Sequence, residues 1–109
     1  MNYYLVQGDT GSQIKVDLSR KGTTEAVDLT NATCVLKVRK EATAQLSFTT
    51  IGVLEIGSTS SVVFLLGDDM LTIEPGRYEA EVEVTFTSAG ETLIESVYEI
   101  IQLFVREDF

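Results

Sequence analysis

The sequence predicts an all-β protein, namely an antiparallel β-sandwich of seven or eight strands with at most one short helical turn. Residues 77–87 alternate strictly between apolar and polar side chains, which is the period of a half-buried strand. Other short runs rich in β-branched residues follow one another along the chain, separated by turns that contain glycine. No segment shows the helical period of a long amphipathic helix.

The first half of the chain contains several short runs with this alternation. Residues 13–19 illustrate it, with an apolar side chain at every second position, and the turn-forming residues 8–11 separate them from the run before. The expected strands are 3–7, 13–19, 33–40, 44–50 and 53–56. The last two are expected to pair as a hairpin through Ile51 and Gly52.

Two later strand regions are apolar on both faces. The expected strand 61–66 is nearly continuous in apolar residues, and so is part of the expected strand region 92–106. A strand that is buried on one face only should alternate, so the second apolar face needs a loop, a neighbouring subunit or a partner to cover it. The predicted interaction surface consists of Val63, Leu65, Ile100 and Phe104, with Phe109 at its rim.

The segment before residue 77 is expected to close one end of the core. Residues 67–73 can form the single helical turn. The next residues, Glu74-Pro75-Gly76-Arg77-Tyr78-Glu79-Ala80, resemble the acidic-x-Gly-x-Tyr-x-Cys pattern at the tyrosine corner of immunoglobulin-type sandwiches. Ala80 stands where that pattern has a disulfide-bonded Cys. The resemblance implies an immunoglobulin-like fold without this disulfide, with a structural corner formed by Pro75, Gly76 and Tyr78.

Length, charge and cysteine content limit the classes of function. A chain of 109 residues is expected to form one domain, 1–109. Its net charge of −9 disfavours nucleic acid and anionic membranes as partners. The first residues lack the basic and apolar segments of a secretory signal, so we expect synthesis in a cytoplasm without export. Cys34 is alone, so we expect no internal disulfide and a core position for its side chain.

Most catalytic constellations lack a necessary residue. Histidine is absent, which removes the commonest general base and the commonest transition-metal ligand. Cys34 therefore has no imidazole to activate it. Glu79, Glu81 and Glu83 share one strand face, where they form a solvated stripe rather than a sheltered acid and base. We expect no enzyme activity and no catalytic residue.

Metal and cofactor sites are not expected either. Asp68, Asp69 and Glu74 cluster in one corner, but they lack the spacing of a calcium-binding loop. Gly8 and Gly11 are close together, yet no helix is expected after them and no Lys-Ser or Lys-Thr pair completes a phosphate-binding loop. We expect no cofactor, no metal and no small-molecule substrate.

Four short motifs follow one another in an order that points to a family. They are Gln7-Gly8-Asp9-Thr10-Gly11, Val27-Asp28-Leu29-Thr30-Asn31-Ala32-Thr33, Pro75-Gly76-Arg77-Tyr78-Glu79-Ala80-Glu81 and Leu103-Phe104-Val105-Arg106-Glu107-Asp108-Phe109. In this order they resemble small immunoglobulin-like structural proteins of tailed bacteriophages, in particular the N-terminal domain of phage baseplate upper proteins. In that family the domain attaches a distal organelle to the virion core. The resemblance implies a virion component made in the host cytoplasm, whose partners are other virion proteins or further copies of the chain.

Other functions are compatible with the same fold. The sequence lacks the oligomerisation and receptor-binding parts that follow the domain in that family, so a stand-alone tail, neck or head-decorating protein is an alternative. A carbohydrate-binding module would need exposed aromatic side chains, and because Trp is absent its candidates are Tyr3, Tyr4 and Tyr98. A bacterial adhesion or adaptor domain is a third alternative, which the lack of an export signal disfavours.

Overall fold

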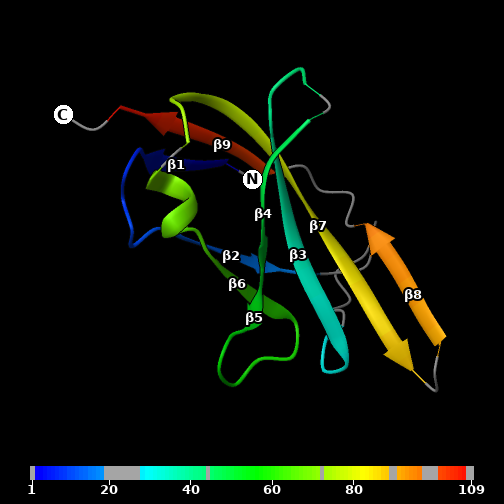
Figure 1. Cartoon of the computed structure of the whole chain (residues 1–109). Helices are drawn as coiled ribbons and strands as arrows, with labels where there is room; N and C mark the ends of the chain where they lie inside the picture. Colours follow the sequence, from blue (N-terminus) through cyan, green and yellow to red (C-terminus); the bar gives the residue numbers. More distant parts are fainter. Residues whose placement is uncertain are drawn as a thin grey trace.

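The computed structural model describes residues 2–18, 28–43, 45–71, 73–88, 91–96 and 101–107, which form two packed β-sheets (Figure 1). The larger sheet contains β1 (Asn2–Val6), β3 (Ala32–Lys40), β4 (Leu46–Ile51), β7 (Gly76–Ser88), β8 (Glu91–Ser96) and β9 (Ile101–Arg106). The smaller sheet contains β2 (Gln13–Asp17), β5 (Val53–Leu54) and β6 (Ser61–Leu65). Within these residues the one helical element is the short turn η1 (Asp68–Leu71). The predicted all-β sandwich is confirmed.

The strand order is β1-β9-β7-β3-β4 in the larger sheet, with β8 also paired to β7, and β2-β6-β5 in the smaller sheet. The described strand pairs are antiparallel except for β1 and β9, which run parallel with Tyr4 opposite Phe104. This parallel pair was not predicted from the sequence. The reason is that β1 joins the sheet beside β9, while its sequence neighbour β2 lies in the other sheet.

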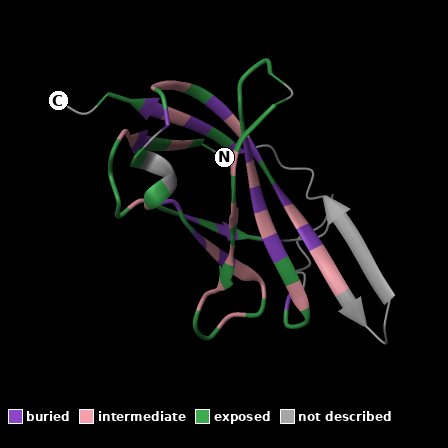
Figure 2. Ribbon diagram, in the orientation of Figure 1, coloured by how far each residue is buried: buried purple, intermediate pink, exposed green. Residues whose placement is uncertain are grey.

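The pairing of β3 with β7 forms the centre of the larger sheet. It runs from Ala32 opposite Phe86 to Lys40 opposite Tyr78, so alternate residues of both strands face the smaller sheet. These side chains meet apolar residues of β2 and β6 in a continuous core (Figure 2). The largest fully buried side chains are Ile14, Leu29, Leu36, Val38, Val62, Phe64, Leu66, Val82, Ile101 and Leu103. The inward positions predicted along β7 are buried from residue 78 to residue 84.

The predicted hairpin between β4 and β5 is wrong. β4 is hydrogen-bonded to β3 in the larger sheet, and β5 to β6 in the smaller. Between them, the Gly52 amide still donates to the Cys34 carbonyl at 2.8 Å, and the chain then crosses to the other sheet. A Cβ on Gly52 would lie 2.3 Å from Val62 Cγ1. The glycine therefore marks a close passage over the core and a change of sheet, and not a tight turn.

The predicted strand region 92–106 comprises two described strands, β8 and β9, which pair with different parts of β7. Glu83 of β7 lies opposite Ser96 of β8, and Ala80 lies opposite Ile101 of β9. From Glu83 to Ala80, β7 moves by three positions, whereas the chain from Ser96 to Ile101 moves by five. One continuous register with β7 therefore cannot include both β8 and β9. Of the described strands, β5 is the shortest, with two residues.

The structural corner predicted at residues 75–78 is present. Tyr78 is buried, and its hydroxyl donates to the Glu74 carbonyl at 2.7 Å, which is the contact of a tyrosine corner. Pro75 lies in the bend before β7. Gly76 has a φ of 146°, a conformation that glycine adopts far more readily than other residues. The corner therefore fixes where β7 begins and how it enters the sheet.

Candidate interaction surfaces

An apolar patch lies on the outer face of the smaller sheet. We define this side patch as Val53, Val63 and Leu65. Val53 lies opposite Val63 in the pairing of β5 with β6. The Thr50 hydroxyl donates to the Leu65 carbonyl at 3.2 Å, which holds the end of β4 beside the end of β6. Val53 and Leu65 are 66% and 63% exposed, so the patch is open to solvent. Ile51 is 68% exposed as well, but it lies opposite Val35 on the outer face of the larger sheet and is not part of the patch.

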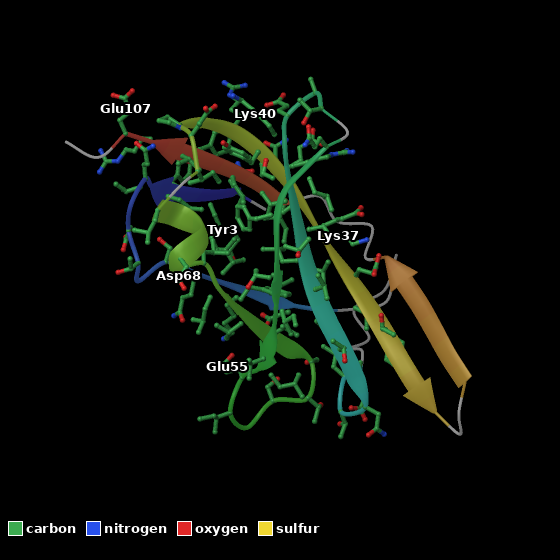
Figure 3. The ribbon with its side chains drawn as sticks, in the orientation of Figure 1. Tyr3, Lys37, Lys40, Glu55, Asp68 and Glu107 are labelled. Atoms are coloured by element: carbon green, nitrogen blue, oxygen red, sulfur yellow. The ribbon has the colours of Figure 1, made fainter. Side chains whose placement is uncertain are left out.

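Polar contacts border the side patch on its sheet. Lys15 of β2 forms an ion pair with Glu55 at 2.7 Å (Figure 3), and the hydrogen bond and charge of Glu55 raise the pKa of Lys15 above its ordinary value. The Ser61 hydroxyl donates to the Asp17 carboxylate at the other end of the β2–β6 pair. These groups satisfy one another, so a partner that covers the patch need not replace their contacts.

The structure separates the predicted interaction residues onto two faces. Val63 and Leu65 lie in the side patch, whereas Phe104 lies on the outer face of the larger sheet. Ile100 and Phe109 lie outside the described residues. Sequence reasoning missed Val53, because the expected hairpin paired its strand with β4 and not with β6. The available signal was a bulky β-branched residue directly after a single glycine.

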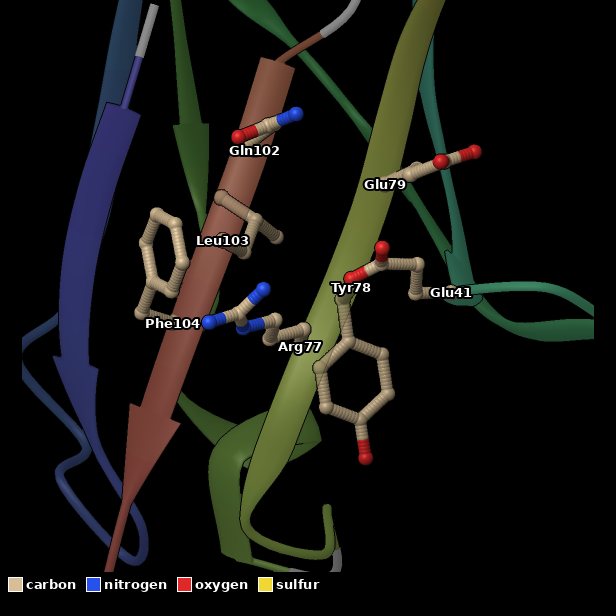
Figure 4. A pocket seen from close by; sticks show the side chains of 7 residues that line it. All are labelled: Glu41, Arg77, Tyr78, Glu79, Gln102, Leu103 and Phe104. Carbon is tan, nitrogen blue, oxygen red and sulfur yellow. The ribbon is translucent and has the colours of Figure 1, made fainter.

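Tyr4, Phe104 and Arg77 form a second exposed feature, which we call the aromatic row. They are cross-strand neighbours on β1, β9 and β7. The rings of Tyr4 and Phe104 are 5.1 Å apart between centroids with 17° between their planes, and Arg77 Cζ is 5.8 Å from the Phe104 centroid. Figure 4 shows Arg77 reaching from β7 towards Phe104. Because the ring separation is close to the spacing of strands, the rings stack along the strand-to-strand direction. Phe104 is half-buried and Tyr4 is 77% exposed.

Two depressions lie beside the aromatic row. An open groove of about 510 Å³ is lined by residues of β1, β7 and β9, and its charged lining residues are Arg77 and Arg106. A niche of about 50 Å³ lies beside Glu41 and Glu79 (Figure 4). Small-molecule sites usually enclose several hundred Å³. The groove has that volume but is open and mostly apolar, and the niche is far smaller.

Cations of β3 flank the acidic stripe of β7. Arg39 pairs with Glu79 at 3.0 Å, and Lys37 pairs with Glu83 at 2.5 Å (Figure 3). Lys37 also lies opposite Glu81. The hydrogen bond to Glu83 is the main cause of a raised pKa at Lys37. The stripe was predicted to be a solvated face and not a sheltered acid and base. Two of its carboxylates have cationic partners because all nine residues of β3 pair with β7.

The remaining candidate residues for chemistry are Cys34 and the acidic residues of the corner. Cys34 is buried, and this burial raises the pKa of its thiol, which disfavours the nucleophilic thiolate. At the corner, Glu74 lies 3.6 Å from Lys40, Asp68 is exposed, and the Asp69 side chain lies outside the described residues (Figure 3). In the part of the chain that the structure describes, no group of three or more His, Cys, Asp or Glu residues could hold a metal ion.

The fold and these surfaces define a two-sheet β-sandwich with an exposed aliphatic patch and an exposed aromatic row. A scan against protein-family models finds no match for the chain, and no curated protein matches it. No helix within the described ranges is long and apolar enough to cross a membrane.

Proposed function

We propose that this chain is a non-enzymatic structural protein of a bacteriophage or prophage virion. It works as an assembly or attachment module of the tail or baseplate, through association with other virion proteins and with copies of itself. The observation that carries the proposal is the side patch, where large aliphatic side chains lie together and mostly exposed. Single exposed apolar residues are ordinary, but contiguous patches mark interaction sites. The choice of a virion is supported by the resemblance to phage baseplate upper proteins.

Covering the side patch supplies the energy for association. Full burial of a Val or Leu side chain is worth about 1.5–3 kcal/mol, and Val53 and Leu65 have roughly two thirds of that still to gain. The bordering ion pair of Lys15 and Glu55 is already formed and can stay at the rim. The surface that fits the side patch is therefore flat and aliphatic, with a polar margin.

The chemistry of the chain supports a role without catalysis. Histidine is absent, and the Cys34 thiol is buried with a raised pKa. Of the three acid–base candidates on β7, Glu79 and Glu83 are bound to Arg39 and Lys37, and Glu81 is exposed. A structural component needs none of these groups to be reactive.

Particle composition tests the proposal. Virions purified from the strain that carries the gene should contain the chain at a constant ratio to the major tail protein, measured by quantitative mass spectrometry. Finding the chain in the head or neck fraction would instead support the alternative of a head- or neck-decorating protein. Virions that lack the chain altogether would contradict the proposal.

Variants of the side patch test whether incorporation into virions depends on this patch. Leu65→Asp places a charge in the patch and should lower incorporation about tenfold, which corresponds to about 1.4 kcal/mol of lost association energy. Leu71→Asp is the matched control, because Leu71 is 54% exposed and lies in η1, outside the patch. Circular dichroism should show that both variants are folded. Equal incorporation of the two variants would count against the side patch.

A carbohydrate-binding module is a second candidate because Tyr4 exposes its ring. Tyr3 does not add to such a site, since its hydroxyl donates to the Lys15 carbonyl at 2.5 Å and ties β1 to β2. Tyr98 lies outside the described residues. Phe104 stacks on one face of Tyr4, so one ring face is left for a sugar. Binding on a glycan array that is lost in Tyr4→Ala would favour this function over the first.

A further inference from the structure

We infer that β1 pairs edge to edge with β1 of a second copy of this chain, in antiparallel orientation and with Tyr4 opposite Tyr4. The larger sheets of two copies then join into one. This inference rests on the proposed function as an association module and deepens it, because it names one partner and a surface other than the side patch. Four observations on β1 lead to it, namely its position, its backbone directions, its lack of charge and the aromatic row.

β1 is the last strand on its side of the larger sheet, and its backbone points outward there. No described strand pairs with it beyond β9. The Gln7 amide donates to the Arg106 carbonyl of β9 at 2.9 Å. Successive residues of a strand direct their backbone groups to opposite sides, so the N–H and C=O of Tyr4 point away from β9. The Val6 carbonyl also points away, because it accepts the Asp9 amide at 3.1 Å. Tyr4 therefore presents an outward donor and an outward acceptor.

β1 also lacks the features that prevent exposed edge strands of different molecules from pairing. Such edges usually carry charges, proline or a bulge. The five residues of β1, Asn-Tyr-Tyr-Leu-Val, are uncharged, and their register with β9 is continuous. The opposite edge strand, β4, has an irregular register with β3 between Val38 and Arg39, and Thr50 ties its end to β6. In a chain of net charge −9, an uncharged strand is where a second copy meets little repulsion.

The geometry of β1 is self-complementary about Tyr4. Tyr4 is the central residue of the strand, so antiparallel pairing on Tyr4 places Asn2 opposite Val6 of the second copy. The two Tyr4 residues then exchange a pair of N–H···O=C bonds, about 5.5 Å apart between Cα atoms. Phe104 covers one face of the Tyr4 ring, and the open face points to the edge. In the dimer, the open faces of the two Tyr4 rings lie about one strand spacing apart. The aromatic row thereby continues from one copy into the other.

Sedimentation velocity on the full-length chain, over a wide range of concentration, tests the dimer. The wild-type chain should form a dimer. Tyr4→Lys should weaken it at least about tenfold, since it opposes two like charges at the centre of the pairing. Tyr4 is 77% exposed, so the folded chain does not depend on it. Leu65→Lys adds the same charge at a residue that is 63% exposed on the other sheet, and it should leave the dimer intact.

Disulfide trapping tests the register. Tyr4→Cys should form an interchain disulfide under mild oxidation, because Cα atoms about 5.5 Å apart suit a disulfide. Asn2→Cys is the control, since the two Asn2 residues are about 14 Å apart in this register, beyond the limit of about 7 Å. Cys34 is buried and common to both variants.

Three outcomes overturn the inference. They are a wild-type chain that stays monomeric, a dimer that Tyr4→Lys leaves unchanged, and equal trapping of the two cysteine variants. A dimer that Leu65→Lys abolishes also overturns it, because self-association would then use the side patch. Particle incorporation is measured separately, so a failed dimer test with normal incorporation leaves the proposed function standing. A chain that forms the dimer but is missing from virions would contradict the proposed function and leave the dimer inference standing.

Discussion

Gly52 passes so close to Val62 that a Cβ added to Gly52 would lie 2.3 Å from Val62 Cγ1. The ring of Phe64 is nearly as close, at 2.6 Å from the same position. Val62 and Phe64 are both fully buried in the core. The lack of a side chain at Gly52 therefore allows one stretch of chain to contribute β4 to the larger sheet and β5 to the smaller.

Gly52→Ala should destabilise the fold strongly. The added methyl group forces buried side chains or the backbone to move, and overpacking of this kind costs about 1–3 kcal/mol. Urea unfolding followed by circular dichroism measures the change. Gly11→Ala is the matched control, because its Cβ would meet only Asp9 Oδ1 at an ordinary 3.5 Å, and it should change stability by less than about 0.5 kcal/mol.

The combination of Gly52→Ala with Val62→Ala tests the contact itself. Val62→Ala removes the Cγ1 atom that the new methyl group meets, so the double variant should be more stable than the sum of the single changes predicts. The coupling should be at least about 0.5 kcal/mol, in the favourable direction. Strict additivity would show that the two residues do not touch.

Tyr78→Phe should lower stability by about 1 kcal/mol, since it removes the hydroxyl that donates to the Glu74 carbonyl and keeps the ring in the core. For a domain of this size, such a change lowers the melting temperature by roughly 4 °C. Tyr4→Phe serves as the control because the Tyr4 side chain is mostly exposed. Equal melting temperatures for the two variants would mean that the corner hydrogen bond adds nothing to stability.

The ion pair of Lys37 and Glu83 should make stability depend on pH in the alkaline range. The pKa of Lys37 is raised above its ordinary 10.5, chiefly by the hydrogen bond to Glu83. The folded chain therefore holds this proton more tightly than the unfolded chain. The stabilisation is complete below pH 10.5 and is lost as the pH rises through the folded pKa.

Glu83→Gln isolates this contribution. The variant keeps a hydrogen-bond acceptor but removes the charge, so its unfolding midpoint should fall less steeply above pH 10.5 than that of the wild-type chain. Chemical denaturation at a series of pH values gives the two curves. Parallel curves would show that the ion pair does not contribute, which is a known outcome for exposed pairs.

The Cys34 thiol should react only after unfolding. It is buried, and burial raises its pKa, so both access and thiolate content are low in the folded chain. Labelling with a thiol reagent followed by mass spectrometry should therefore be slow in buffer and fast in denaturant. Rapid labelling of the native chain would contradict the buried position.

The sequence was sufficient to predict what depends on local alternation. Strand β7 could be found because Tyr78, Ala80, Val82 and Val84 fall at every second position, and each is buried. The outward, exposed position of Leu65 followed from the same periodicity in β6. The tyrosine corner could be found because a short motif specifies a local contact.

Features that depend on which strands become neighbours could not be predicted. Nothing in the order of residues indicates that Lys37 would face Glu83, because the partner of a strand is chosen by the whole fold. For the same reason the parallel position of β1 beside β9 was missed. Gly52 was misread because a glycine between two strands is typical both of a turn and of a close passage over the core.

The parallel pairing of β1 with β9 determines how the fold bears tension. These are the first and last strands that the structure describes, and they run in the same direction. A pull on the outer ends of both drags them past each other lengthwise, so all the bonds between them resist together. An antiparallel pair pulled in this way opens one bond after another. The β1–β9 pair therefore resists a pull on its two outer ends better than an antiparallel pair in the same place would.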